Sequence, residues 1–220
     1  MIPQISQAPG EVPLVLNYLQ ALEQQGFTGD TATRYADRLT MATDNSIYQL
    51  LPDAVVFPRS TADVALLARI AGEERYQSLV FTPRGGGTGT NGQALNQGII
   101  IDMSRYMNRI IEINSDDLYA VVEPGVITAE FAATVAKKNL FYPPDPGSQA
   151  VSTLAGNIAE NAGGLRGLKY GVTKDYLMGI EFFDATGEVV KSGSRTVKCV
   201  TGYNLAGMMV QSEGDRKSVV

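Results

Sequence analysis

A glycine-rich run, Pro83-Arg84-Gly85-Gly86-Gly87-Thr88-Gly89-Thr90-Asn91-Gly92, stands between two short apolar segments. Glycine has no Cβ, so such a run tolerates positive φ and lets a ligand approach the backbone closely. Successive amide N–H groups in this kind of loop form a concave anion site, for which a diphosphate is a natural ligand. A flexible surface loop is the alternative. The apolar segments on both sides favour the ligand-binding interpretation.

The segments around this run predict a small parallel sheet. Ser60 is followed three residues later by Asp63, which is the spacing of a capping box and predicts a helix from residue 62 to residue 74. Strands joined by such a helical crossover are typical of parallel pairing. Short β-branched or leucine-containing runs predict the strands themselves, over residues 54–57, 79–82 and 98–102.

The remainder of the chain indicates helices and antiparallel strands. Apolar spacing predicts a helix over residues 11–25 that ends at Gly26, and a second short helix is expected over residues 30–43. Thr128 is expected to cap a helix that runs through Lys138. Antiparallel strands are predicted over residues 109–113 and 119–123, and a hairpin over residues 177–184 and 188–191.

Composition excludes several classes of function. The net charge is -5 and the sequence pI is about 4.8, and basic residues are adjacent only at Lys137–Lys138 and Arg216–Lys217, so nucleic acid is not an expected partner. The chain has no histidine, which excludes a Ser-His-Asp triad and histidine-ligated zinc. The single cysteine, Cys199, is interpreted as core filler. No apolar run has membrane-spanning length, and a cytoplasmic location is expected, with peripheral association at the inner membrane as the alternative.

A second segment is rich in small residues. The run Pro143-Pro144-Asp145-Pro146-Gly147-Ser148 is followed by Thr153-Leu154-Ala155-Gly156-Asn157 and then by Glu160-Asn161-Ala162-Gly163-Gly164. Small side chains let a backbone lie flat against a planar ligand. Tight helix packing through Ala and Gly explains the same composition equally well. The glycine-rich run is also neither a Walker loop, because no GK[ST] follows it, nor a good Rossmann fingerprint.

Taken together, these segments resemble the FAD-binding domain of the vanillyl-alcohol oxidase/p-cresol methylhydroxylase (PCMH) type. Lys169-Tyr170-Gly171, Thr201-Gly202-Tyr203-Asn204-Leu205 and Ser212-Glu213-Gly214 extend the likeness, which covers roughly residues 53–214. Within that family the chain is most similar to the FAD-binding subunit of glycolate oxidase, to D-lactate dehydrogenases and to FAD-linked oxidases of the D-2-hydroxyglutarate dehydrogenase kind.

The resemblance implies an α+β fold of two subdomains with FAD extended between them. It implies a small parallel-sheet subdomain over residues 53–102 and a larger, mainly antiparallel one with helices over residues 103–214. FAD is expected to bind non-covalently, since Thr88 stands where some members carry a histidine that links to the flavin. The implied cofactor-binding residues are Arg84, Gly85, Gly86, Gly87, Thr88, Gly89, Pro144, Asp145, Thr153, Gly156, Asn157, Ala162, Gly163, Gly164, Tyr170 and Gly171.

The resemblance also implies oxidation of a D-2-hydroxyacid by hydride transfer to flavin N5. The base and the carboxylate-binding arginines of the family generally lie in a cap domain, so no catalytic residue and no metal ligand is assigned here. An iron-sulfur or other electron-transfer subunit is an implied partner. Three alternatives remain: a flavin-binding module without activity of its own, an NADPH-dependent reductase of UDP-N-acetylenolpyruvylglucosamine, and a phosphate-binding interaction domain without flavin.

The expected organisation has three parts. Residues 1–47 are expected to form an N-terminal helical extension, and residues 48–214 the FAD-binding domain, whose second subdomain is expected to be incomplete. Residues 215–220, with the sequence Asp-Arg-Lys-Ser-Val-Val, are interpreted as a non-native tail of a C-terminally truncated fragment.

Overall fold

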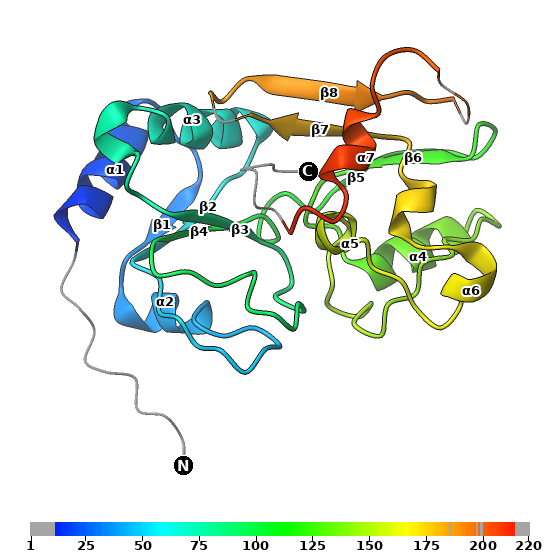
Figure 1. Cartoon of the computed structure of the whole chain (residues 1–220), viewed down its shortest axis with the longest axis horizontal. Helices are drawn as coiled ribbons and strands as arrows, with labels where there is room; N and C mark the ends of the chain where they lie inside the picture. The colour runs from blue at the N-terminus through cyan, green and yellow to red at the C-terminus, as the bar shows by residue number, and fades with distance from the viewer. Residues whose placement is uncertain (1–11, 185, 197, 199, 214–220) are drawn as a thin grey trace.

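The chain folds into two halves that lie side by side in space (Figure 1). The computed structural model describes residues 12–184, 186–196, 198 and 200–213. The N-terminal half, residues 12–103, holds a mixed sheet in the order β1-β2-β4-β3, and the C-terminal half, residues 104–213, pairs β5 with β6 and β7 with β8. Helices combined with parallel and antiparallel strands confirm the predicted α+β class. Cys199, Gly214 and the tail 215–220 lie outside the described residues.

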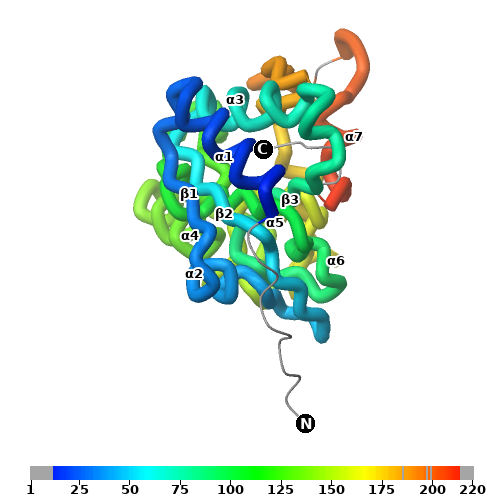
Figure 2. The backbone as a smooth tube through the Cα atoms, turned by 90° about the vertical axis from the view of Figure 1, so that its left-hand side faces the viewer, coloured from blue at the N-terminus to red at the C-terminus, as the bar shows by residue number. Residues whose placement is uncertain are grey.

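The sheet of the N-terminal half is covered on both faces. Both β2 and β3 run parallel to β4, which confirms the predicted parallel sheet, and every residue of β2 and β4 is buried. Figure 2 shows α1 and α3 together on one side of these strands and α2 on the other. The elements are α1 (Pro13–Gln24), β1 (Asp30–Ala32), α2 (Tyr35–Thr40), β2 (Ala54–Phe57), α3 (Thr61–Ala71), the 3-10 turn η1 (Glu74–Tyr76), β3 (Phe81–Arg84) and β4 (Ile99–Asp102).

The segment before residue 48 contributes to this sheet as well as to its covering helices. Strand β1 pairs antiparallel with β2, so the prediction of a helix over residues 30–43 is wrong for its first residues. Three residues without an apolar pattern carry no strand signal, and pairing with β2 determines their conformation. Helix α1 joins the core through Tyr18, whose hydroxyl donates to the Leu67 carbonyl at 2.9 Å and whose ring meets Tyr76 edge to face.

The C-terminal half is built from smaller units. The predicted strand pair and hairpin are confirmed, because β5 pairs antiparallel with β6 and β7 with β8. Thr128 begins α4 but is not its cap, contrary to prediction: its hydroxyl donates to the Ser152 carbonyl at 2.9 Å. The elements are β5 (Ile110–Asn114), β6 (Tyr119–Val122), α4 (Thr128–Ala136), α5 (Leu154–Glu160), α6 (Gly167–Tyr170), η2 (Thr173–Tyr176), β7 (Gly179–Phe183), β8 (Val189–Gly193) and α7 (Leu205–Met209).

A groove of about 980 Å³ opens within the C-terminal half. Strands of both pairs contribute to its walls, and α4 contributes Phe131 and Val135. Most of its lining side chains are apolar. The two strand pairs therefore leave apolar side chains facing the groove, whereas every residue of β2 and β4 in the N-terminal sheet is buried. None of the helices in the described ranges is both long and apolar enough to cross a membrane.

Candidate functional site

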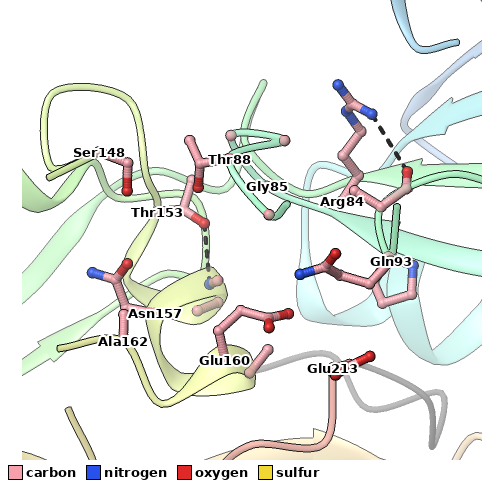
Figure 3. Close-up of a pocket in the computed structure, with 18 of the residues that line it drawn as sticks. Arg84, Gly85, Thr88, Gln93, Ser148, Thr153, Asn157, Glu160, Ala162 and Glu213 are labelled. Atoms are coloured by element: carbon pink, nitrogen blue, oxygen red, sulfur yellow. Dashed lines mark hydrogen bonds between the residues drawn. The ribbon is translucent and has the colours of Figure 1, made fainter. Parts of the chain in front are cut away.

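A cavity of about 280 Å³ lies between the two halves, at the C-terminal end of β3 (Figure 3). The glycine-rich run forms one wall, and the second small-residue segment forms the opposite wall. The two segments singled out by the sequence therefore meet in one place. The predicted residues that line the cavity are Arg84, Gly85, Gly86, Gly87, Thr88, Gly89, Thr153, Gly156, Asn157 and Ala162.

The glycine-rich loop turns its carbonyls toward the protein. The Arg84 carbonyl accepts from the Met103 amide at 2.9 Å, and the Gly87 carbonyl accepts from the Asn45 amide at 3.1 Å. Gly87 has φ of +62°, a conformation that favours glycine. Within the described part of the chain, the backbone N–H groups of residues 85–90 donate to no protein acceptor. This row of unpaired amides beside a cavity fits an anion such as a diphosphate.

Arg84 braces the loop and does not reach into the cavity. Its guanidinium donates to the Thr43 carbonyl at 2.7 Å and to the carbonyls of Met41 and Ala94 at 3.4 Å. In Figure 3 it points away from Thr153 and Asn157. Burial lowers the pKa of Arg84, although nearby Asp44 and Asp102 act in the opposite direction. Anion binding by this loop therefore depends on backbone amides.

The two walls touch where the loop begins. A Cβ placed on Gly85 would collide with the Thr153 hydroxyl, and a Cβ placed on Gly86 would collide with the Val151 carbonyl oxygen. The Val151 oxygen belongs to the backbone, so it cannot rotate out of the way. Glycine at these two positions lets the loop of the N-terminal half pack directly on the C-terminal half.

Hydrogen bonds hold α5 in the opposite wall. The Thr153 hydroxyl accepts from the Gly156 amide at 3.2 Å and caps the helix. The buried Asn157 side chain donates to the Thr128 hydroxyl at 2.7 Å, which ties α5 to α4. The Leu154 amide donates to the Val126 carbonyl at 2.9 Å. This wall is therefore anchored by backbone and side-chain bonds from residues 126–128.

Six predicted residues do not line this cavity: Pro144, Asp145, Gly163, Gly164, Tyr170 and Gly171. The Asp145 carboxylate instead forms an ion pair with Arg166 at 3.3 Å. Gly164 packs closely on Asp145, since a Cβ there would collide with the Asp145 backbone and carboxylate. The Tyr170 carbonyl accepts from the Tyr176 hydroxyl at 2.5 Å. These residues shape the loop next to the cavity.

Several lining residues were missed by the sequence analysis. Gln93, Ser148, Glu160 and Glu213 bring polar side chains to the cavity. Ser148, Glu160 and Glu213 were quoted only as parts of longer motifs, and Gln93 stands after the glycine-rich run in a segment with no regular pattern. A lone polar residue carries no periodic signal, so only the folded chain brings these four together. Among the described residues, no group of three or more His, Cys, Asp or Glu is placed to hold a metal ion.

Comparison with known proteins identifies a family and its members. Residues 52–193 match the family described as the FAD binding domain. The D-2-hydroxyglutarate dehydrogenase of Escherichia coli strain K12 is 63% identical over 190 residues, which are 86% of this chain and 19% of that protein. The glycolate oxidase subunit GlcD of Bacillus subtilis strain 168 is 45% identical over 168 residues, 76% of this chain and 35% of the subunit. The chain thus spans about a fifth to a third of the length of these relatives.

Solved structures agree on the fold. An alkyldihydroxyacetonephosphate synthase superposes with a TM-score of 0.77 at 22% identity and covers 96% of this chain and 39% of its own. The 6-hydroxy-D-nicotine oxidase of Arthrobacter nicotinovorans superposes with a TM-score of 0.67 at 26% identity, covering 76% of this chain and 36% of its own. The first likeness shows the shared PCMH-type fold, in agreement with the predicted architecture.

Proposed function

Because the chain belongs to the FAD binding domain family, we propose that it is the flavin-binding part of an enzyme that oxidises a D-2-hydroxyacid. The observation that carries this proposal is the high identity, over most of the chain, to a D-2-hydroxyglutarate dehydrogenase. Two further relatives are named glycolate oxidase subunit and D-lactate dehydrogenase, and glycolate and D-lactate belong to the same chemical class as D-2-hydroxyglutarate. The substrate class is therefore a small 2-hydroxy carboxylate.

The cavity between the halves fits this cofactor. The unpaired amides of residues 85–90 would hold the diphosphate, and Thr88 and Thr90 add hydroxyl donors beside them. The small residues Ala155, Gly156 and Ala162 leave room in the opposite wall. Pro144, Asp145, Gly163, Gly164, Tyr170 and Gly171 form the adjoining loop, where the flavin ring would extend beyond the cavity. When bound, FAD supplies hydride-accepting chemistry, and these residues hold it in position without a covalent bond.

The groups that bind and deprotonate the hydroxyacid belong to a part of the enzyme outside this chain. The chain covers only 19% of the E. coli relative, so four-fifths of such a protein is available to supply them. The likeness to a glycolate oxidase subunit supports a multisubunit assembly in which an electron-transfer subunit accepts the electrons. A flavin-binding module without activity of its own is the competing function.

The visible absorption spectrum of the purified 220-residue chain tests the proposal. We expect flavin bands that move into the supernatant when the protein is precipitated with acid, because no histidine is present to form a histidyl-flavin link. Anaerobic addition of D-2-hydroxyglutarate, D-lactate or glycolate to the longer natural protein should then bleach those bands. A folded chain that stays colourless with added FAD would refute the cofactor assignment, and a yellow full-length protein that none of the acids bleaches would refute the substrate class.

A further inference from the structure

The charged groups of the cofactor cavity are mostly acidic. Glu160 and Glu213 line it, and the basic residue among its described lining, Arg84, is committed to three backbone carbonyls on the far side of the loop. A diphosphate carries two negative charges at neutral pH. Within the described lining, the ligand therefore meets two carboxylates and no free cation.

The two carboxylates are held near each other by the fold. Glu160 is the last residue of α5, and the Glu213 amide donates to the carbonyl of the preceding residue, Ala159, at 3.0 Å. This bond fixes the segment after α7 against the end of α5. Figure 3 shows both side chains directed toward the space below the glycine-rich loop. The C-terminal end of a helix also carries partial negative charge, which adds to the unfavourable field at Glu160.

Gln93 faces Glu160 from the opposite wall. Its side-chain oxygen accepts from the Asn91 amide at 3.0 Å, and this bond orients the side chain so that its NH2 group points at Glu160 (Figure 3). Gln93 is neutral, so it offers the Glu160 carboxyl a hydrogen-bond donor without a compensating charge. The carboxyl can therefore keep this partner in its neutral form.

Burial raises the pKa of Glu160, the hydrogen bond from Gln93 lowers it, and the charge of Glu213 raises it again, so that the net shift is upward. The charged groups that face this carboxyl in the described structure are Glu213, on the segment after α7, and Arg84, whose guanidinium is turned away. Lys174, on η2 beside α5, does not act on the Glu160 carboxyl, and no described ion pair includes Glu160. No described cation therefore stabilises the ionised form.

We propose that Glu160 couples binding of FAD to uptake of a proton, so that its carboxyl stays neutral to a higher pH in the complex than in the ligand-free protein. The proposal rests on the cofactor assignment above and adds a pH dependence to it. A neutral Glu160 removes one of the two carboxylate charges that would repel the diphosphate and keeps the hydrogen bond from Gln93. A bound anion favours this neutral form further.

Because binding of FAD is coupled to proton uptake by Glu160, the affinity for FAD is expected to fall as the pH rises. Below the pKa that Glu160 has in the ligand-free protein, the carboxyl is already neutral and affinity for FAD is constant. Between that value and the higher pKa of the complex, each complex takes up a proton, and affinity falls by up to about tenfold for each unit of pH. Above both values affinity is constant again at its weaker level.

The test measures the dissociation constant of FAD for the full chain, by quenching of flavin fluorescence, from about pH 5 to about pH 8.5. We expect wild-type affinity to fall at least fivefold across this range. Glu160→Gln, which is nearly isosteric, should keep the low-pH affinity throughout. Calorimetric titrations in two buffers of different ionisation enthalpy should show proton uptake by the wild type and none by Glu160→Gln.

Two further variants make the result independent of one substitution. Gln93→Ala removes the interaction that lowers the pKa of Glu160 and should move the pH transition upward, whereas Glu213→Gln should move it downward. Equal pH slopes in wild type and Glu160→Gln would overturn the proposal while leaving the cofactor assignment intact. Absence of FAD binding at every pH in both proteins would overturn the cofactor assignment and this inference with it.

Discussion

The two halves of the chain enclose their strands to different extents. In the N-terminal half, one buried cluster lies between the sheet and the helices α1 and α3, and a second cluster around Val55, Phe57 and Ile100 covers the other face. In the C-terminal half, the residues of β6 are half-buried and those of β8 alternate between exposed and half-buried. A groove of about 980 Å³ separates its strand pairs. The N-terminal half thus forms a closed core and the C-terminal half an open one.

This difference explains how the candidate site is supported. The glycine-rich loop begins at the end of an edge strand, β3, in the closed half, where Pro83 is tolerated because an edge strand need not donate on both sides. Its backbone is fixed there by bonds to Asn45 and Met103. The opposite wall, α5, belongs to the open half and depends on local bonds such as that from Asn157 to Thr128. One wall is therefore held by a core and the other by a polar network.

The comparison is tested most strongly by substituting a fully buried strand isoleucine of the N-terminal half and an exposed strand isoleucine of the C-terminal half. Ile99→Ala in β4 removes a fully buried side chain from the closed core and should lower the free energy of unfolding by about 2–5 kcal/mol. Ile111→Ala in β5 removes a side chain that is 62% exposed and should cost less than about 1 kcal/mol. Chemical denaturation followed by circular dichroism measures both values.

Equal losses at the two positions would show that Ile111 contributes as much to packing as a fully buried residue, which contradicts an open packing of β5. Ile99→Val provides a second point if Ile99→Ala does not fold, with an expected loss of about 0.5–1.5 kcal/mol. This milder change removes a single methylene group from the same position, so it probes the same contacts.

The contact between the halves is tested by Gly86→Ala. The new Cβ would collide with the Val151 carbonyl oxygen, and relief requires the loop and the segment before α5 to move apart. We expect a loss of about 1–3 kcal/mol in stability and a loss of at least tenfold in FAD affinity. Gly147→Ala is the matched control, because a Cβ there meets no atom within 4 Å and the residue is exposed. If both variants bind FAD as the wild type does, the contact at Gly86 does not shape the site.

Local sequence patterns predicted the helices and strands whose residues follow a regular apolar spacing or a known cap or turn signal. The apolar runs of β2 and β4, the Ser60 cap of α3 and the β7–β8 hairpin were visible because each repeats a local rule over several residues. The Ser60 hydroxyl indeed accepts from the Asp63 amide at 3.2 Å. Strand β1 was not visible, since its conformation comes from pairing with a distant strand.

The site followed the same division. The glycines of the loop and Thr153, Gly156 and Asn157 stand in runs of unusual composition, and the family resemblance implied them as cofactor-binding residues; they line the cavity. Gln93 was not singled out, and Glu213 was quoted only within the motif Ser212-Glu213-Gly214; the two residues are 120 positions apart in sequence, and the folded chain brings both to the cavity. Arg84 was also among the predicted cofactor-binding residues, although its guanidinium is bound to the carbonyls of Met41, Thr43 and Ala94. Side-chain direction in a loop is decided by tertiary contacts.

The weakest effect is expected at Thr153, where the open half depends on a single cap. Thr153→Ala removes the hydroxyl that accepts from the Gly156 amide and should cost about 1 kcal/mol of stability. Thr153→Ser keeps a capping hydroxyl and should restore most of the loss. Because α5 forms one wall of the cavity, Thr153→Ala should also weaken FAD binding by a few-fold, and fluorescence titration of both variants measures this. Unchanged affinity in Thr153→Ala would mean that the polar network through Asn157 holds α5 without its cap, and that the open half is more rigid than its groove indicates.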